Sequence, residues 1–476
     1  MKKKFLLLNP PGTKKYFRDY YCTCVSKAKY YYHPLDLVYI SGRLDKHYEL
    51  SVIDAIAEEL NAESTLEKIK EFNPQIIFFL ISSPSYEEDV PFLTQVKEAL
   101  PKTQLIGSSD VYREVREKAF VLHPFLDAIL LDFSTDDLLN YLKKPKGLID
   151  NVLYRAKDGT IVAGAEKHGY GAADMPIPRW DLFPLKRYIF PFSRRGHYAT
   201  ILTDFGCPFT CTFCPMSTIG FKLRDLDTVI KEVKLLQKLG INEFFIRDQT
   251  FGVNKPRSYQ LLERIQKEKL NISWTCFSRV DVVDEKLLKT MKDAGCHTIM
   301  FGIETSNEEL LKTYKKNIKV KQMFDALALC QKVDLRTVGT FIIGLPGETK
   351  ESIEKTIALS TQLGLDYASF NIATPRFGTT FRKDLLEKGL VQEKVMRMDS
   401  AKSKPVFKNN RTFVQNSGGK PHRVKEISNE EIFQLQRTAI RTFYMRPRYL
   451  LKRIVSIKTP HELKEHLSEG LSLLFD

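Results

Sequence analysis

Short apolar runs alternate with amphipathic stretches over residues 1–145 of the chain. Each run has the length of a buried strand, and the stretches between them have the spacing of helices. Strands separated by helices form parallel sheets, which bind ligands at the carboxyl ends of their strands. The pattern predicts a five-stranded, doubly wound (Rossmann-like) domain with strands at 5–8, 50–53, 76–81, 104–106 and 128–131.

Two helices of this domain have recognisable starts. Ser64-Thr-Leu-Glu67 has the pattern of a capping box, and residues 91–100 predict a second helix that starts at Pro91. Residues 146–195 follow with little periodicity, a glycine-rich stretch and several prolines. We interpret them as a linker.

The alternation of strands and helices resumes over residues 196–385, with clear helix ends. Gly240 and Gly295 stop the helices 227–239 and 284–294, and Pro256 begins another. Successive strand and helix units of this kind form a partial (β/α)6 barrel, with function at the carboxyl ends of the strands. The predicted strands are 198–203, 242–247, 272–280, 297–303, 337–343 and 367–373.

Residues 386–476 predict a small helical region that begins with a basic loop. Ser428-Asn-Glu-Glu431 is a capping box, and the helix after it carries an apolar stripe that includes Ile432 and Phe443. The segment 446–453 that follows is strongly basic. This region is either an amphipathic segment on a membrane surface or a helix that covers the barrel mouth, and we prefer the second interpretation.

Composition supports a multidomain globular protein. A chain of 476 residues is long enough for two or three domains, and 43% of its residues are hydrophobic. The longest apolar run, 76–81, is far shorter than the roughly 18 residues of a membrane span. The apolar run 5–8 is too short for a signal peptide, so we expect a cytoplasmic protein whose first strand starts there.

The formal net charge of +15 raises the question of a polyanionic partner. The charges are spread along the chain, and no nucleic-acid-binding motif appears. We therefore expect a solvated basic surface and no nucleic-acid partner.

The eight cysteines divide into one motif and scattered thiols without a disulfide framework, which is typical of a reducing compartment. Cys276, Cys296 and Cys330 fall in apolar elements and are predicted to be small core residues. Cys22 and Cys24 are interpreted as loop thiols without a chemical role.

The motif is Asp204-Phe-Gly-Cys-Pro-Phe-Thr-Cys-Thr-Phe-Cys, with thiols at Cys207, Cys211 and Cys214. A four-iron cluster normally uses four thiolates, so three would leave one iron open to a substrate or cofactor. Zinc sites usually add a second pair of ligands further along, and no matching pair follows. The spacing therefore favours an iron-sulfur cluster.

This CxxxCxxC spacing resembles that of the radical SAM superfamily, and Phe213 matches the aromatic residue that lies against adenine there. The resemblance implies a 4Fe-4S cluster that chelates S-adenosylmethionine (SAM). It also implies a one-electron reductant such as flavodoxin or ferredoxin as partner, and cleavage of SAM to a 5'-deoxyadenosyl radical.

Polar residues end four predicted barrel strands at positions that resemble the superfamily's SAM contacts. The resemblance assigns Asp248 to the methionine amino group and Arg279 to the methionine carboxylate. It assigns Glu304 to the ribose hydroxyls and the backbone of Gly344 to adenine. No residue is assigned a catalytic role.

The first domain resembles the cobalamin-binding domain of one radical SAM subfamily, through Asn9-Pro-Pro11 and Val52-Ile-Asp-Ala55. The resemblance implies a cobalamin between the two domains, cradled by strand ends that begin at Asn9, Asp54, Ser82 and Gly107. Two strand ends depart from the subfamily, because Gly107-Ser-Ser-Asp110 replaces a glycine pair and Asp132-Phe-Ser-Thr135 replaces a Gly-Glu-Gly-Glu turn. A DxHxxG motif is also absent.

Three functions remain open. We expect a radical SAM enzyme that carries out cobalamin-dependent methylation of an unactivated carbon. The alternative within this class is a cobalamin-free cyclase or rearranging enzyme with a vestigial first domain. A binding protein that keeps a cluster for structure or redox sensing would not need the polar strand ends. The sequence does not identify the substrate.

Overall fold

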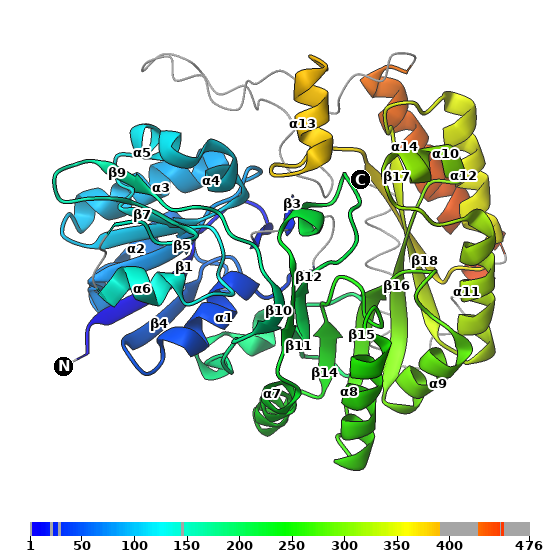
Figure 1. The fold of residues 1–476 in the computed structure, drawn as a ribbon, viewed down its shortest axis with the longest axis horizontal. Helices are drawn as coiled ribbons and strands as arrows, with labels where there is room; N and C mark the ends of the chain where they lie inside the picture. The colour runs from blue at the N-terminus through cyan, green and yellow to red at the C-terminus, as the bar shows by residue number, and fades with distance from the viewer. Residues whose placement is uncertain are drawn as a thin grey trace.

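Two α/β domains lie side by side in the computed structural model, which describes residues 2–19, 22–26, 30–143, 147–390, 427–447 and 449–451. The first domain is blue to cyan in Figure 1, and the second is green to yellow. Each is built around a sheet of mainly parallel strands with helices packed against it.

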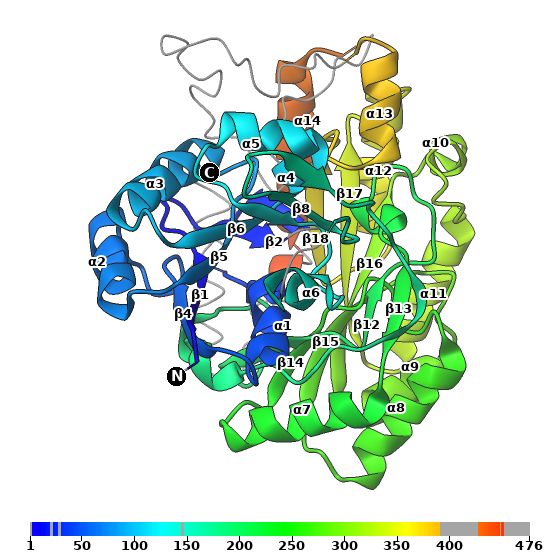
Figure 2. The same ribbon diagram turned by 60° about the vertical axis from the view of Figure 1, so that its left-hand side comes forward.

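The first sheet has seven strands in the order β4-β1-β5-β6-β7-β8-β9 and faces the viewer in Figure 2. β4, β1, β5, β6 and β7 are parallel, as predicted. The sheet has two more strands than the predicted five, because β8 and β9, which come from the expected linker, join it in antiparallel orientation. The strands are β1 Lys4–Asn9, β4 Glu49–Asp54, β5 Ile76–Leu80, β6 Gln104–Ser108, β7 Ala128–Leu130, β8 Val152–Arg155 and β9 Ile161–Ala163.

Two helices of this domain start at residues other than those predicted. Asn61 caps α2 by accepting a hydrogen bond from the backbone of Ser64, so the capping box predicted at Ser64 is wrong. α3 begins at Tyr86 and carries Pro91 in its interior. The helices are α1 Leu35–Leu44, α2 Ala62–Phe72, α3 Tyr86–Ala99, α4 Asp110–Val115, α5 Ala119–Leu122 and α6 Asp137–Lys143, with a short 3-10 helix η1 Arg116–Lys118.

A two-stranded hairpin that the sequence pattern did not predict stands between β1 and α1. Its antiparallel strands are β2 Tyr16–Asp19 and β3 Cys22–Val25, so the interpretation of Cys22 and Cys24 as loop thiols is wrong, because both lie in a strand. Arg18 of β2 donates a hydrogen bond to the side chain of Asn9, the last residue of β1. The hairpin is thus joined to the carboxyl edge of the first sheet.

The second sheet has six parallel strands in the order β11-β14-β15-β16-β17-β18, which confirms the predicted strand and helix units. The helix starts at Pro256 and after Asp284 are confirmed as well. The strands are β11 Tyr198–Ile201, β14 Glu243–Ile246, β15 Ser273–Ser278, β16 Cys296–Glu304, β17 Arg336–Ile343 and β18 Tyr367–Ile372. The helices are α7 Leu226–Lys238, α8 Lys255–Lys267, α9 Glu285–Asp293, α10 Glu308–Thr313, α11 Val320–Lys332, α12 Lys350–Gln362 and α13 Thr380–Glu387.

A small three-stranded sheet joins the first domain to the barrel. It contains β10 Tyr170–Ala173, β13 Phe221–Arg224 and β12 Asp204–Gly206 in that order. Three 3-10 helices stand near it in the chain, η2 Trp180–Leu182, η3 Leu185–Arg187 and η4 Pro215–Thr218. The cysteine motif lies between β12 and β13, so this sheet holds both ends of the cysteine loop.

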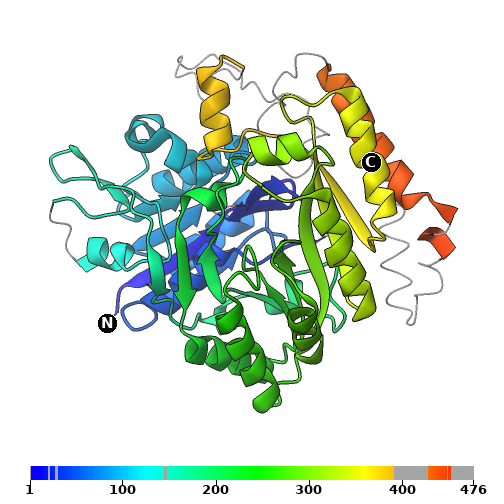
Figure 3. The same cartoon turned by 45° about the vertical axis from the view of Figure 1, so that its right-hand side comes forward.

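Helix α14, Asn429–Tyr444, packs along β18 and against α12 (Figure 3). Its predicted capping box at Ser428 is confirmed. Gln436 donates to the carbonyl of Phe370, so α14 lies along the last strand, and Ile432 near its start lies next to Gly344. Residues 391–426, which contain the predicted basic loop, and residues 448, 452 and 453 of the segment 446–453 lie outside the described residues. Among those described, no helix is both long and apolar enough to cross a membrane.

The two domains share buried contacts. One hydrophobic cluster contains residues of both, such as Phe5 and Tyr198. Lys222 of β13 pairs with Asp132, which follows β7, at 2.7 Å, with both side chains buried. These contacts bring the carboxyl edges of the two sheets toward the cysteine loop.

Candidate active site

The cysteine loop is shaped by two glycines. Gly206 and Gly220 have φ values of +94° and +75°, which residues with a side chain rarely adopt. A Cβ on Gly206 would lie 2.1 Å from the carbonyl oxygen of Gly220, so only glycine allows this close backbone approach. The backbone of Cys207 then donates to the same carbonyl at 3.0 Å, which directs the chain into the motif.

The three motif thiols are unpaired with other cysteines and largely enclosed. Burial raises the pKa of all three, and the neighbouring thiols help to raise the pKa of Cys214 to about 12. This mutual influence indicates that Cys207, Cys211 and Cys214 share one space. An iron-sulfur cluster is bound by thiolates, and nearby positive charge favours the thiolate form.

Positive charge is present at Cys211. Arg279 Nη1 lies 3.7 Å from its Sγ, and the charges of Lys316 and Arg279 lower the pKa of Cys211 against the larger effect of burial. Within the described residues, no three His, Cys, Asp or Glu side chains are grouped tightly enough to hold a single metal ion. A multi-iron cluster does not require such a group, since each thiolate binds a different iron. The donor set therefore fits a 4Fe-4S cluster.

Arg279, at the end of β15, supports the cysteine loop from one side. Its guanidinium forms an ion pair with Asp281 at 2.9 Å and donates to the carbonyl of Lys316 at 2.7 Å. It also stacks on the ring of Phe209, 3.8 Å from the ring centre. The structure thus places this predicted SAM contact directly against the motif.

Glu304 ends β16 in a left-handed conformation with φ of +66°. Its carboxylate pairs with Lys316 Nζ at 2.8 Å, and both side chains are nearly buried. Since Lys316 also acts on Cys211, Glu304 belongs to the same cluster of charges. The sequence did not single out Lys316, because one lysine in a lysine-rich stretch carries no signal of its own.

Asp248 lies at the end of β14, fully buried beside Asp204. Its carboxylate accepts hydrogen bonds from the backbone of Thr203 at 2.6 Å and of Asp204 at 3.1 Å. Burial and the neighbouring Asp248 raise the pKa of Asp204, and Asp204 Oδ1 has no hydrogen-bond partner. A cation would relieve the repulsion between these two carboxylates. The assignment of Asp248 to the methionine amino group stays a prediction.

Gly344 and Phe213 are the two residues that the resemblance assigns to adenine. Gly344, with φ of +85°, donates its N–H to Glu348 at 2.7 Å, and a Cβ there would lie 3.1 Å from Ile432. Burial raises the pKa of Glu348 to about 7. Phe213 packs against the small apolar cluster that contains Leu345. Phe213 thus shares an apolar cluster with the residue that follows Gly344, and Glu348, which the sequence analysis did not assign, hydrogen-bonds Gly344.

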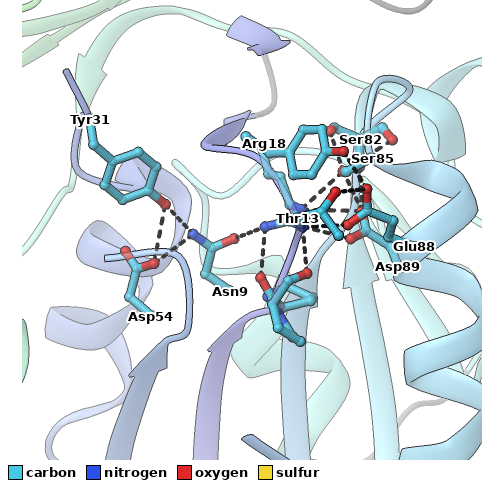
Figure 4. A network of polar contacts seen from close by, with 12 residues as sticks. Asn9, Thr13, Arg18, Tyr31, Asp54, Ser82, Ser85, Glu88 and Asp89 are labelled. Atoms are coloured by element: carbon cyan, nitrogen blue, oxygen red, sulfur yellow. Dashed lines mark hydrogen bonds and ion pairs between the residues drawn. The ribbon is translucent and has the colours of Figure 1, made fainter. Parts of the chain in front are cut away.

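At three of the four strand ends assigned to cobalamin, the polar side chains of Asn9, Asp54 and Ser82 are occupied by other parts of the chain (Figure 4). Asn9 donates to Asp54 at 2.9 Å, and the hydroxyl of Ser82 hydrogen-bonds that of Ser85 at 2.7 Å. A Cβ on Gly107 would lie 2.5 Å from the ring of Tyr112. As arranged, these residues do not fit a cobalamin.

Comparison with known proteins agrees with the geometry of the cysteine loop. Residues 201–360 match the Radical SAM superfamily. An uncharacterised methyltransferase of Pyrococcus horikoshii is 30% identical over 433 residues, which are 88% of this chain and 90% of that protein. The anaerobic magnesium-protoporphyrin IX monomethyl ester cyclase of Rubrivivax gelatinosus is 26% identical over 72% of this chain and 64% of that protein.

Two solved structures share the fold. The radical SAM methyltransferase TsrM of Kitasatospora setae, with cobalamin and a [4Fe-4S] cluster bound, has a TM-score of 0.63 at 16% identity, over 82% of this chain and 78% of that one. The cobalamin-dependent radical SAM enzyme OxsB, with aqua-cobalamin and SAM bound, has a TM-score of 0.70 at 15% identity. The match covers 99% of this chain and 71% of that one. At these identities the likeness shows the fold alone.

The barrel, the three thiols and the basic residues beside them define an iron-sulfur enzyme that acts through SAM. This chain belongs to the radical SAM superfamily. Its cofactors are accordingly a 4Fe-4S cluster and SAM.

Proposed function

We propose that this enzyme cleaves SAM reductively to methionine and a 5'-deoxyadenosyl radical, which removes a hydrogen atom from an unactivated carbon of the substrate. The observation that carries the proposal is the position of Arg279 and the Lys316–Glu304 pair beside the thiols of the cysteine loop. A cluster held by these thiols supplies the electron, and the protein supplies binding and orientation. A one-electron donor such as flavodoxin or ferredoxin is the proposed partner.

The residues around the loop bind and orient SAM. Arg279 and Lys316 add two positive charges beside Cys211, which favours thiolates and attracts the carboxylate of methionine. Glu304 holds Lys316 in place and offers a carboxylate to the ribose hydroxyls. Phe213 and the backbone at Gly344 form the apolar side on which adenine would lie. Enclosure of the thiols keeps water away from the reacting atoms.

Two fates of the substrate radical are supported by different observations. Methyl transfer is favoured by the 30% identical relative that is called a methyltransferase and matches over 90% of its length. A cobalamin-free ring closure or rearrangement is favoured by the occupied strand ends of the first domain. The second is also consistent with a cyclase among the relatives.

The test is anaerobic incubation of the reconstituted enzyme with dithionite and SAM. We expect 5'-deoxyadenosine and methionine in equal amounts, measured by mass spectrometry. SAM with a deuterated methyl group, added together with a small-molecule cell extract, separates the two fates. A product that gains the label supports methyl transfer, whereas 5'-deoxyadenosine without a labelled product supports the second. An enzyme that holds its cluster and forms no 5'-deoxyadenosine would refute the proposal.

Glu304→Gln should weaken SAM binding by about 10-fold or more, because a charge-assisted hydrogen bond contributes roughly 1.5–3 kcal/mol. Cluster content should stay normal, since the thiols are unchanged. Calorimetric titration with SAM and iron analysis measure the two effects. Asp325→Asn, which breaks the exposed pair of Asp325 with Lys321, is the matched control and should change neither. Loss of iron in Glu304→Gln would show instead that Glu304 supports the loop.

A further inference from the structure

The carboxyl edge of the first sheet is closed by the chain's own side chains. Asn9, Asp54, Ser82, Ser85 and Asp89 are each at most 1% exposed. In Figure 4 they form one connected network, with Arg18 of the β2–β3 hairpin between them. A ligand that used this edge would have to compete with these contacts.

Arg18 fills the space between the ends of β1 and β5. Its Nη2 pairs with Asp89 at 2.7 Å, and both side chains are completely buried. Nη1 donates to Asn9 Oδ1 at 2.9 Å and to the carbonyl of Pro10 at 2.8 Å, while Nε donates to Ser85 Oγ at 3.0 Å. Every nitrogen of the guanidinium is therefore engaged within the chain.

Asp54, at the end of β4, is equally occupied. It accepts hydrogen bonds from the Asn9 side chain at 2.9 Å, from the hydroxyl of Tyr31 at 3.1 Å and from that of Tyr188 at 2.9 Å. The backbone N–H of Ala57 donates a further bond at 3.1 Å. Three of these bonds reach Oδ1 and the fourth reaches Oδ2, so a ligand at Asp54 would have to compete with four donors of the chain itself.

The remaining strand ends are closed as well. Above β6, the rings of Tyr112 and Phe79 would lie 2.5 Å and 2.8 Å from a Cβ on Gly107. Asp110 accepts from Thr23 of the hairpin at 2.9 Å. After β7, Asp132 pairs with Lys222 of the barrel. The two strand ends that depart from the cobalamin-binding subfamily thus bind protein groups.

The hairpin also contacts the barrel domain. Asp19 pairs with Arg247, which follows β14, at 2.5 Å, and both side chains are buried. The guanidinium of Arg247 also lies over the ring of Tyr32, 5.5 Å from its centre. The hairpin is therefore held from both domains, by Arg18 and Thr23 on one side and by Asp19 on the other.

We propose that the β2–β3 hairpin takes the place of a cobalamin, so that the first domain of this enzyme binds none and serves as a wall of the barrel. Bringing a corrin to this edge would expel Arg18 and leave Asp89 buried without its cation, which is strongly unfavourable. This inference does not depend on SAM cleavage, because the thiols proposed for that reaction lie in the cysteine loop of the barrel domain.

Anaerobically reconstituted enzyme is mixed with hydroxocobalamin and passed through a gel-filtration column. We expect no cobalamin absorbance with the protein above that of a serum albumin blank, and undiminished 5'-deoxyadenosine formation in the same sample. Stoichiometric retention by the wild-type enzyme would overturn the proposal. Absence of both cobalamin and 5'-deoxyadenosine would count against the proposed function and leave this inference standing.

A pair of variants tests whether the hairpin is integral to the domain. Arg18→Met should lower the Tm by several degrees and speed amide exchange at the ends of β1 and β5. Lys15→Met removes a more exposed pair with Glu59, 3.8 Å apart, from the same region and should change little. If the two variants behave alike, the hairpin is loosely held, can move aside for a ligand, and the proposal fails.

Discussion

Replacing any one of Cys207, Cys211 and Cys214 by Ala is expected to abolish both the brown colour of the enzyme and its cleavage of SAM. Each thiolate binds its own iron, so none of the three is dispensable. The charges of Cys207 and Cys211 both raise the pKa of Cys214, which indicates that the three thiols lie close together.

Iron and sulfide content, the visible spectrum and 5'-deoxyadenosine yield measure this effect. Cys330→Ala is the control, because Cys330 is a buried thiol on α11 outside the motif. It should lower stability slightly and leave the iron content unchanged. A single motif variant with normal iron and normal 5'-deoxyadenosine would overturn the cluster assignment.

Arg224→Ala is expected to lower the free energy of unfolding by about 3–5 kcal/mol, the range for breaking a buried ion pair by removing one partner. Arg224 pairs with Glu232 at 2.7 Å, and both side chains are buried. Its other nitrogen donates to the hydroxyl of Tyr39 at 3.1 Å and to the carbonyl of Leu202 at 2.6 Å. The substitution leaves Glu232 buried without a cation and loosens the contact between the two domains.

Urea unfolding followed by circular dichroism measures the loss. Arg264→Ala is the matched control, because its ion pair with Asp227 is largely exposed, and it should cost only about 0–1 kcal/mol. Equal effects of the two variants would mean that Arg224 is not essential to the contact between domains.

Local patterns predicted the parts of this protein that depend on neighbours in the chain. The barrel strands are contiguous apolar runs, and the helix predicted over 284–294 is present as Glu285–Asp293. The cysteine spacing likewise lies within one short loop, so the cluster and the superfamily could be inferred from it. The capping box placed at Ser64 failed because Asn61, three residues earlier, caps the same helix.

The polar networks could not be read from the chain, because their members are distant in sequence. Arg18 meets Asp89 across 71 residues, and Asp19 meets Arg247 across 228. Each of these residues alone resembles an ordinary surface charge. Hydrophobic periodicity predicted the parallel strands of the two sheets but not β8 and β9. Only the packing of the sheets decided which charged side chains were buried. These side chains form ion pairs with one another, because a buried charge is stable only when it is paired.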